Sequence, residues 1–486
     1  MIKNQELKHT MMKGTIFLMI ANLTFLICSF IIHLGLGRYF GPELYGSFGV
    51  ILSLLAVNGI FVQAGIPVAV SKFIAENEEM AFTIRNKALI IQLIFSFIIF
   101  IIYFSLAPII ADSVGDQNLT YYFRLSAIVI PFDALFFVYM YSLNGLRKFG
   151  KQTIIGILYN VLKVVVVFSL VFLGYSLEGA IIGYTAASAI GLVMSMLLCK
   201  IEKSKQIFKS IKLIKFAAPL IVYSIAITLL ISIDLLFVKA FIKNDASTGY
   251  YTSANFLSKV PYYIFLGLSA TLLPSLSKSI DKKNVFQTKS YINNSLRYML
   301  MIILPIIFLV SATSKDLINL VYSDKYLLGA QSLSILIFGL TFLSFFSIFT
   351  TIITANNEPR KSMIFAIMLI PIDVILNIIL IPIYGLMGAA IATSIAIFIG
   401  LIVVMIYVFR CFHTLLNPIS FIRIFLASGI IYLFAFFFSF SGIYLLLWYL
   451  ILFSIYFGLL LLFREIKNDD FGLIKSLYDS VFGRRM

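Results

Sequence analysis

Five ionisable residues lie deep inside long apolar stretches of this sequence, where a charged side chain is costly unless it is paired or functional. They are Asp133, Lys163, Asp234, Lys259 and Asp373. Carboxylates in such places bind cations or protons, and ammonium groups bind anions such as phosphate. The apolar stretches have to be placed first, because they decide which of these groups can meet.

The composition is that of a membrane protein. Hydrophobic residues make up 61% of the 486 residues and charged residues only 12%, whereas about 25% are charged in ordinary globular chains. The apolar residues suffice for roughly fourteen helical spans of about 20 residues each, and the runs lack the alternation of β-barrel strands. We therefore predict an all-α polytopic membrane protein with 14 transmembrane helices.

Basic residues orient these predicted helices. The net charge is +16, but the Lys and Arg residues sit in short clusters between apolar runs, which argues against a nucleic-acid partner. In the 14-span layout, 29 of the 37 Lys and Arg lie on the side of the N-terminus, six lie on the opposite side and two lie within spans. Because basic loops stay in the cytoplasm, we expect a plasma-membrane protein with both termini cytoplasmic.

An internal repeat divides the predicted spans. Tyr175–Gly191, YSLEGAIIGYTAASAIG, matches Tyr384–Gly400, YGLMGAAIATSIAIFIG, at an offset of 209 residues. Six spans separate the two segments, so the two halves have the same orientation, as in transporters built from parallel repeats. The predicted domains are an N-terminal six-helix lobe at 1–205, a C-terminal six-helix lobe at 206–410, an extra C-terminal helix pair at 411–463 and a cytoplasmic tail at 464–486.

Three segments carry a family resemblance. Leu36–Asn77, which begins LGRYFGPELYGSFG, Gly249–Lys278, which begins GYYTSANFLSKVPYY, and Asn377–Ser394, NIILIPIYGLMGAAIATS, resemble the polysaccharide-export (oligosaccharide flippase) family. That family shares a superfamily with multidrug and toxin extruders and lipid II flippases. The resemblance implies a monomeric flippase without a resident cofactor. It would carry a glycan linked to polyprenyl or dolichyl (pyro)phosphate from the inner to the outer leaflet of the lipid bilayer by alternating access.

Two other functions stay open at this point. A cation-coupled multidrug exporter belongs to the same superfamily, although exporters of cationic drugs more often need acidic cavities. A membrane glycan polymerase or glycosyltransferase would need catalytic acids on a sizeable loop. The only adjacent acids outside the predicted spans are Glu78–Glu79 and Asp469–Asp470, which lie on short segments.

Depth within the membrane pairs four of the charges. Asp133 and Lys163 lie equally far from the turn that separates their predicted spans, at roughly 16 Å, and Asp234 and Lys259 share a depth of roughly 12–14 Å in the next hairpin. One interpretation is a pair of structural salt bridges. The resemblance instead implies that Lys163 and Lys259 neutralise the phosphate of the substrate between the lobes. Asp133 is the third substrate-binding candidate.

Asp373 has no basic residue in the neighbouring predicted spans. Asn377 follows one helical turn later on the same face, and Thr393 lies at a similar depth beyond the next turn. Pro371 lacks a backbone donor and so frees a carbonyl. These oxygens form a set suited to a hard cation such as Na⁺. The alternative is a packing residue that stays protonated because burial penalises the charge.

The resemblance extends this set to Asp234. Lipid II flippases have a Na⁺ site built from spans seven, eleven and twelve, and Asp234, Asp373, Asn377 and Thr393 lie on the corresponding predicted spans. The Asp and Asn occur in the reverse order along span eleven. The expectation is a site for Na⁺ or a proton as coupling ion.

Overall fold

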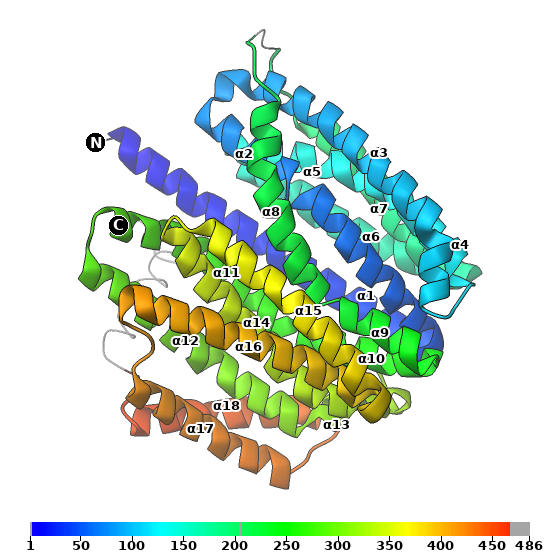
Figure 1. Cartoon of the computed structure of the whole chain (residues 1–486), viewed down its shortest axis with the longest axis vertical. Coiled ribbons are helices and arrows are strands. Elements are labelled where there is room, and N and C mark those ends of the chain that lie inside the picture. Colours follow the sequence, from blue (N-terminus) through cyan, green and yellow to red (C-terminus); the bar gives the residue numbers. More distant parts are fainter. Residues whose placement is uncertain (1, 204–205, 467–486) are drawn as a thin grey trace. The chain divides into compact units, whose positions relative to one another are not determined.

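The computed structural model describes residues 2–203 and 206–466, which form helices joined by short turns (Figure 1). Two compact units can be distinguished. The first comprises Met1–Phe256 and Met363–Ala396, and the second comprises Leu257–Ser362 and Ile397–Met486. Of the predicted tail at 464–486, the part from 467 onward lies outside the described residues. The lobe boundaries come from the sequence repeat and stay a prediction.

The first unit contains the N-terminal helices. They are α1 (Ile2–Gln63), α2 (Ile66–Glu76), η1 (Glu78–Met80), α3 (Ala81–Ser113), α4 (Leu119–Ala127), α5 (Val129–Gly145), α6 (Phe149–Leu170), η2 (Val171–Tyr175), α7 (Ser176–Leu198), α8 (Ile211–Leu230), α9 (Ile233–Ile242) and most of α10 (Asp245–Ser258).

The second unit contains most of the remaining helices. They are α11 (Val260–Asp281), α12 (Val285–Ala312), α13 (Ser314–Val321), η3 (Asp324–Gly329), α14 (Ala330–Ala355), α17 (Pro418–Phe437) and α18 (Tyr444–Leu462). Two further helices, α15 (Pro359–Tyr384) and α16 (Leu386–Phe412), run through both units, and their segment from 363 to 396 belongs to the first.

Eleven stretches of the described chain are long and apolar enough to cross a membrane. Two of them, Met19–Glu76 with 58 residues and Phe149–Leu198 with 50 residues, far exceed the roughly 20 residues of one crossing. Each is interrupted by a glycine with positive φ, Gly41 at 73° and Gly174 at 97°. In Figure 1 the ribbon of α1 folds back on itself, as the break at Gly41 requires.

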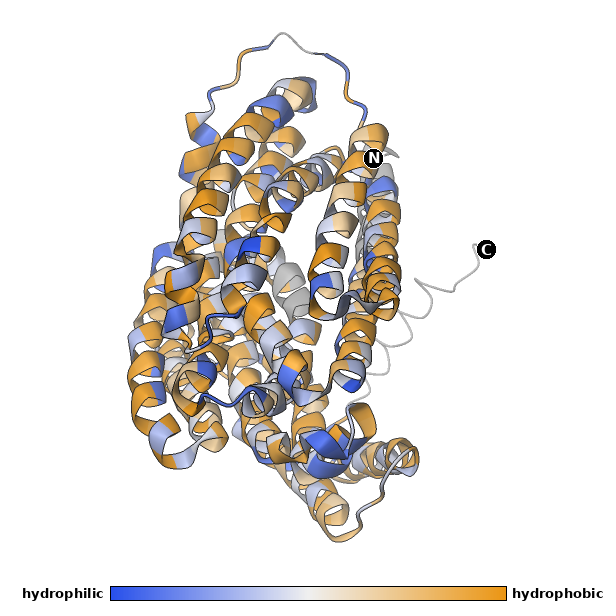
Figure 2. Cartoon of the chain, turned by 90° about the vertical axis from the view of Figure 1, so that its right-hand side faces the viewer, coloured by the Kyte–Doolittle hydropathy of each residue, from blue (hydrophilic) through white to orange (hydrophobic). Residues whose placement is uncertain are grey.

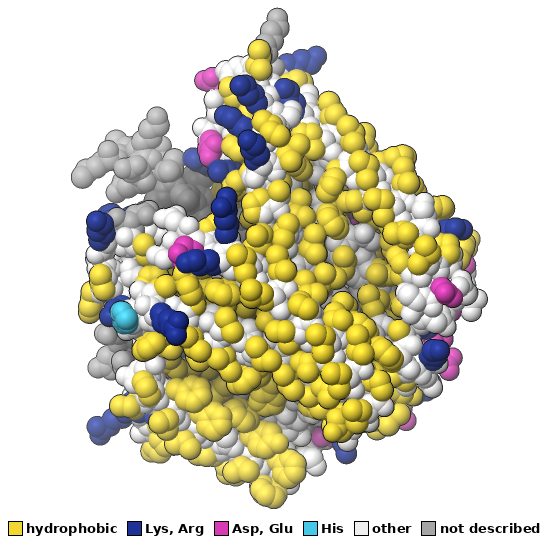
Figure 3. Space-filling view, viewed as in Figure 1, with side chains coloured by type: hydrophobic (Ala, Val, Ile, Leu, Met, Phe, Trp, Pro, Cys, Tyr) yellow, Lys and Arg dark blue, Asp and Glu magenta, His cyan; other side chains and the backbone are white. Residues whose placement is uncertain are grey.

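Apolar and polar side chains occupy different parts of the structure. Apolar residues predominate along the helices in Figure 2, while polar residues concentrate in the turns. Figure 3 shows a face covered largely by hydrophobic side chains, with a cluster of Lys and Arg at the end where α8 begins. A surface of this kind is stable in a lipid bilayer and not in water. The chain is therefore an all-helical, multi-pass membrane protein.

Both copies of the sequence repeat contain the same sharp turn between helices. The aligned residues Ser176 and Gly385 both have a positive φ, of 45° and 59°. One helical turn later, Gly179 and Gly388 lie directly against the preceding helix. A Cβ atom would lie 3.0 Å from its nearest backbone atom at Gly179 and 2.1 Å at Gly388. The absence of a side chain at these two glycines lets the two helices of each hairpin approach closely.

The C-terminal helices α17 and α18 are anchored within the second unit. The carboxylate of Glu465, which is fully buried, accepts a hydrogen bond at 2.7 Å from the Nε of Arg297 on α12. The Tyr456 hydroxyl of α18 donates to the Met301 carbonyl of α12 at 2.8 Å. Trp448, the single tryptophan of the chain, lies on α18 with its ring centroid 5.0 Å from that of Phe440.

The close approach at Gly388 predicts the effect of an added methyl group. Gly388→Ala should lower the free energy of unfolding by about 1–3 kcal/mol, because the Cβ has to displace backbone atoms. The matched control is Gly429→Ala on α17, where nothing lies within 4 Å of the added carbon. There the higher helix propensity of alanine should stabilise the helix by up to about 1 kcal/mol. Circular dichroism melting in detergent measures both, and equal midpoints for the two variants would contradict the proposed steric effect.

Candidate functional site

Asp234, near the start of α9, is fully buried and accepts three hydrogen bonds. The backbone N–H of Leu235 donates to Oδ1 at 2.8 Å, and the Tyr251 hydroxyl and the Asn255 side-chain amide donate to Oδ2 at 2.6 and 3.1 Å. Tyr251 and Asn255 lie one turn apart on α10 and so project from the same face. These three donors offset part of the cost of burying a carboxylate.

A second group of oxygens lies on α15 and α16. Asp373, Asn377 and Thr393 are all fully buried. The Asn377 amide donates to Asp373 at two places, Oδ1 at 3.0 Å and the backbone carbonyl at 2.9 Å. Within the described part of the chain, Asp373 Oδ2, Asn377 Oδ1 and Thr393 Oγ1 have no hydrogen-bond partner. Three buried, unsatisfied oxygens are expensive in an apolar environment, so this arrangement is suited to a bound cation or proton.

The structure brings the two groups together within the first unit. Asp373 and Asp234 are close enough to interact electrostatically, Tyr251 lies near both of them, and Thr393 lies beside Asp373 and Tyr251. The four residues named from the sequence for a coupling ion therefore form one cluster. Tyr251 and Asn255 were not named from the sequence, because the segment DASTGYYTSANFLS contains many polar residues and spacing alone does not single these two out.

The donor set decides which ions the cluster can hold. Two carboxylates, an amide oxygen and hydroxyls are hard ligands, which favour Na⁺ or a proton over soft metals. Among residues 2–203 and 206–466, no group of three or more His, Cys, Asp and Glu is arranged to hold a metal ion. A monovalent cation between Asp373 and Asp234 would reduce the repulsion of the two carboxylates and satisfy the unpaired oxygens.

Lys163 forms a separate site on α6. Its ammonium lies over two tyrosine rings, 4.3 Å from the ring centroid of Tyr159 and 4.9 Å from that of Tyr184 on α7. Ring faces attract cations because they carry partial negative charge. Asp133 on α5 interacts electrostatically with Lys163 and lies beside Tyr159 and Ser188. One oxygen of Asp133 is buried without a hydrogen-bond partner among the described residues.

The Lys163 side chain is half-buried in this arrangement. The tyrosine rings compensate part of the lost hydration, and Asp133 contributes through space. An anion that approaches the exposed part of the ammonium would find a site already organised for it. Lys259, the third residue named for substrate binding, precedes α11 and belongs to the second unit.

The helical fold defines a multi-pass membrane protein that contains two buried polar groups. A family model described as polysaccharide biosynthesis protein matches residues 36–331, which is more than half of the chain. The chain belongs to this family, and the relatives that it matches include a probable flippase. It is accordingly a transporter and not an enzyme.

Two archaeal proteins are similar along most of their length. An uncharacterized membrane protein of Methanocaldococcus jannaschii is 24% identical over 418 residues, covering 80% of this chain and 96% of that protein. The "Probable low-salt glycan biosynthesis flippase Agl15" of Haloferax volcanii is 23% identical over 385 residues, which cover 79% of this chain and 80% of that protein.

Solved structures show the same fold. The lipid II flippase MurJ in an inward closed conformation matches with a TM-score of 0.76 at 19% identity, covering 93% of this chain and 99% of that one. An inward-facing multidrug resistance transporter of the MATE family matches with a TM-score of 0.66 at 16% identity, covering 82% and 98%. At these identities the likeness concerns the fold alone.

The hydrogen bond from Tyr251 to Asp234 can be tested by removing the hydroxyl. Tyr251→Phe should lower the free energy of unfolding by about 1.5–3 kcal/mol, the range for a bond to a charged group. The matched control is Tyr103→Phe, because Tyr103 is also buried but its hydroxyl meets the neutral Ser126 hydroxyl at 3.3 Å. Its loss should be about 0.5–1.5 kcal/mol. A loss for Tyr251→Phe no greater than for Tyr103→Phe in melting experiments would contradict a strong hydrogen bond between Tyr251 and Asp234.

Proposed function

We propose that the protein is a flippase that moves a lipid-linked oligosaccharide, the repeat unit of a polysaccharide, from the inner to the outer leaflet by alternating access. The observation that carries this proposal is the half-buried ammonium of Lys163 held over two tyrosine rings in a membrane helix. Family membership and the flippase name of the Haloferax volcanii relative support it.

The substrate class follows from the charge of this site. A polyprenyl- or dolichyl-linked glycan carries a phosphate or pyrophosphate that has to cross a region of low dielectric constant. Lys163 would neutralise part of that charge, with Asp133 moderating the strength of binding so that the substrate can leave. Lys259 would supply a second cation from the other half of the sequence repeat.

The proposed topology has 14 spans, two six-helix lobes at 1–205 and 206–410, the helix pair at 411–463 and a cytoplasmic tail from 464. This count starts from the eleven apolar stretches of the described chain. Met19–Glu76 and Phe149–Leu198 are each counted as two crossings, and α10 together with α11 is counted as one more. The bias of basic residues toward one side favours cytoplasmic termini in the plasma membrane. We propose that the monomer is the working unit.

Energy input would come from the cation cluster. Asp373, Asn377 and Thr393 offer the three unsatisfied oxygens, and Asp234 adds negative charge beside them. Na⁺ or a proton bound there can bias the inward–outward equilibrium only if it binds one state more tightly than the other. A tenfold bias needs about 1.4 kcal/mol of differential binding, which the burial of one carboxylate in a single state can supply.

A cation-coupled multidrug exporter is the second candidate, because a MATE transporter shares the fold. The chemistry of Lys163 disfavours it, since a half-buried ammonium in the proposed transport pathway would repel cationic drugs. Drug resistance of cells that overproduce the protein, without any change in surface glycan, would favour the exporter.

The role of Lys163 can be tested in cells that depend on this protein for surface glycan. Lys163→Ala should abolish glycan export at unchanged protein abundance, because the phosphate loses its compensating charge. Lys151→Ala is the control, since Lys151 is exposed on the same helix. Export and abundance are measured by glycan staining and immunoblotting. An equal loss of both for Lys163→Ala would instead indicate a structural role.

The coupling ion can be detected without any substrate. A ligand that binds only the folded protein stabilises it by about 2.7 kcal/mol at a concentration of 100 Kd. NaCl should therefore raise the melting temperature of the wild type above its value in choline chloride of equal ionic strength. Asp373→Asn should remove this difference, whereas Asp133→Asn should retain it. If neither Na⁺ nor pH affects the melting or the transport of the wild type, the coupling proposal is wrong and Asp373 is a packing residue.

A further inference from the structure

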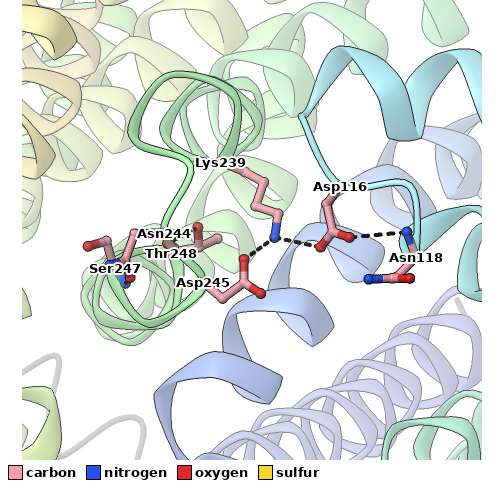
Figure 4. Close-up of polar contacts among 7 residues, drawn as sticks. All are labelled: Asp116, Asn118, Lys239, Asn244, Asp245, Ser247 and Thr248. Atoms are coloured by element: carbon pink, nitrogen blue, oxygen red, sulfur yellow. Dashed lines mark hydrogen bonds and ion pairs between the residues drawn. The ribbon is translucent and has the colours of Figure 1, made fainter.

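Lys239, near the C-terminal end of α9, has a side chain only 2% exposed and binds two carboxylates (Figure 4). Its ammonium donates to Asp116 Oδ2 at 2.8 Å and also to Asp245 Oδ1. The two acids differ in exposure, with 16% of the Asp116 side chain and 48% of the Asp245 side chain accessible. One buried cation thus has one partner that is mostly covered and a second that is about half exposed to solvent.

The three charged residues come from different parts of the chain. Asp116 lies in the turn between α3 and α4, in the first half of the sequence repeat, and the backbone N–H of Asn118 donates to its Oδ1 at 3.1 Å. Lys239 and Asp245 lie six residues apart on the hairpin of α9 and α10, in the second half. The salt bridge to Asp116 therefore joins the halves, while the one to Asp245 stays within a single hairpin.

The same end of the first unit contains a close contact between α1 and α10. A Cβ on Gly249 of α10 would lie 1.9 Å from the Pro42 carbonyl oxygen of α1. One on Gly46 would lie 2.6 Å from the Gly249 nitrogen, and one on Gly49 would lie 2.4 Å from the Thr252 hydroxyl. The backbones of α1 and α10 are in direct contact here, next to the carboxylate cluster.

We propose that Lys239 and Asp116 form a latch that holds this end closed, and that Asp245 makes the latch releasable. This inference rests on the proposed alternating access. Opening separates the halves and breaks the bond of Lys239 to Asp116. The ammonium keeps Asp245, which moves with it, so that the open state contains no unpaired buried cation. Without Asp245, opening would leave the buried Lys239 ammonium without a carboxylate partner, which is energetically costly.

The two acids consequently have opposite effects on opening, which a simple structural clamp would not produce. The reporter is Thr248→Cys, since Thr248 is fully buried on α10 beside Gly46. It is placed in a full-length chain whose three native cysteines are replaced by alanine. The measurement is the rate of labelling by a membrane-impermeant maleimide in lipid nanodiscs, which expose both faces of the membrane.

Asp116→Asn should raise the labelling rate about tenfold, because the closed state loses the salt bridge between Lys239 and Asp116. A tenfold change corresponds to roughly 1.4 kcal/mol. Asp245→Asn should lower the rate below that of the parent, because opening then leaves Lys239 unpaired. Lys239→Arg should preserve the parent rate more closely than Lys239→Gln, which should raise it. The matched control is Asp112→Asn, an exposed acid beside the same turn, which should leave the rate unchanged.

Changes in the same direction for Asp116→Asn and Asp245→Asn would overturn the latch. So would unchanged labelling accompanied by lower melting temperatures, which is the result expected of a structural clamp. The labelling requires no glycan. A protein that shows the opposite effects but exports no glycan would retain the latch and refute the proposed function.

Discussion

A charged group within a hydrocarbon layer has to recover from the protein what it loses in hydration. The described charges of the first unit meet this demand in different ways. Asp234 receives three hydrogen bonds, Lys163 lies over two aromatic rings, and Lys239 binds two carboxylates. Asp373 is satisfied on one oxygen only. These contacts hold the surrounding helices together, and we propose that ligands bind at the oxygens that lack a partner and at the exposed part of the Lys163 side chain.

One short helix connects several of these features. On one face, α10 carries Tyr251 and Asn255, which hold Asp234, and on another it carries Gly249 and Thr252, which meet α1. Its first residue is Asp245. A shift of α10 would therefore alter the cation cluster and the closed end together. Rigid elements that have two discrete arrangements are the physical means by which distant sites influence each other.

The sequence predicted the helical class and the grouping of Asp373, Asn377 and Thr393, because spacing along a helix and depth in a membrane both follow from counting residues. Counting could not identify Tyr251 as a partner of Asp234, since 26 tyrosines occur in the chain and their orientation depends on tertiary packing. The equal depth of Asp133 and Lys163 was readable, but the rings that hold Lys163 were not. The burial of Lys239 likewise depends on a contact with a residue 123 positions away.

The position of Trp448 determines what optical spectroscopy can report. As the sole tryptophan, it sits on α18 against Phe440, in the second unit. Its intrinsic fluorescence will follow the environment of the C-terminal helix pair, while changes around Lys163, Asp373 and Lys239 have no indole nearby in the sequence to record them. The native fluorescence therefore contributes little signal from these sites. If Trp448 is replaced by phenylalanine and a single tryptophan is introduced into α10, the emission will report on that helix alone.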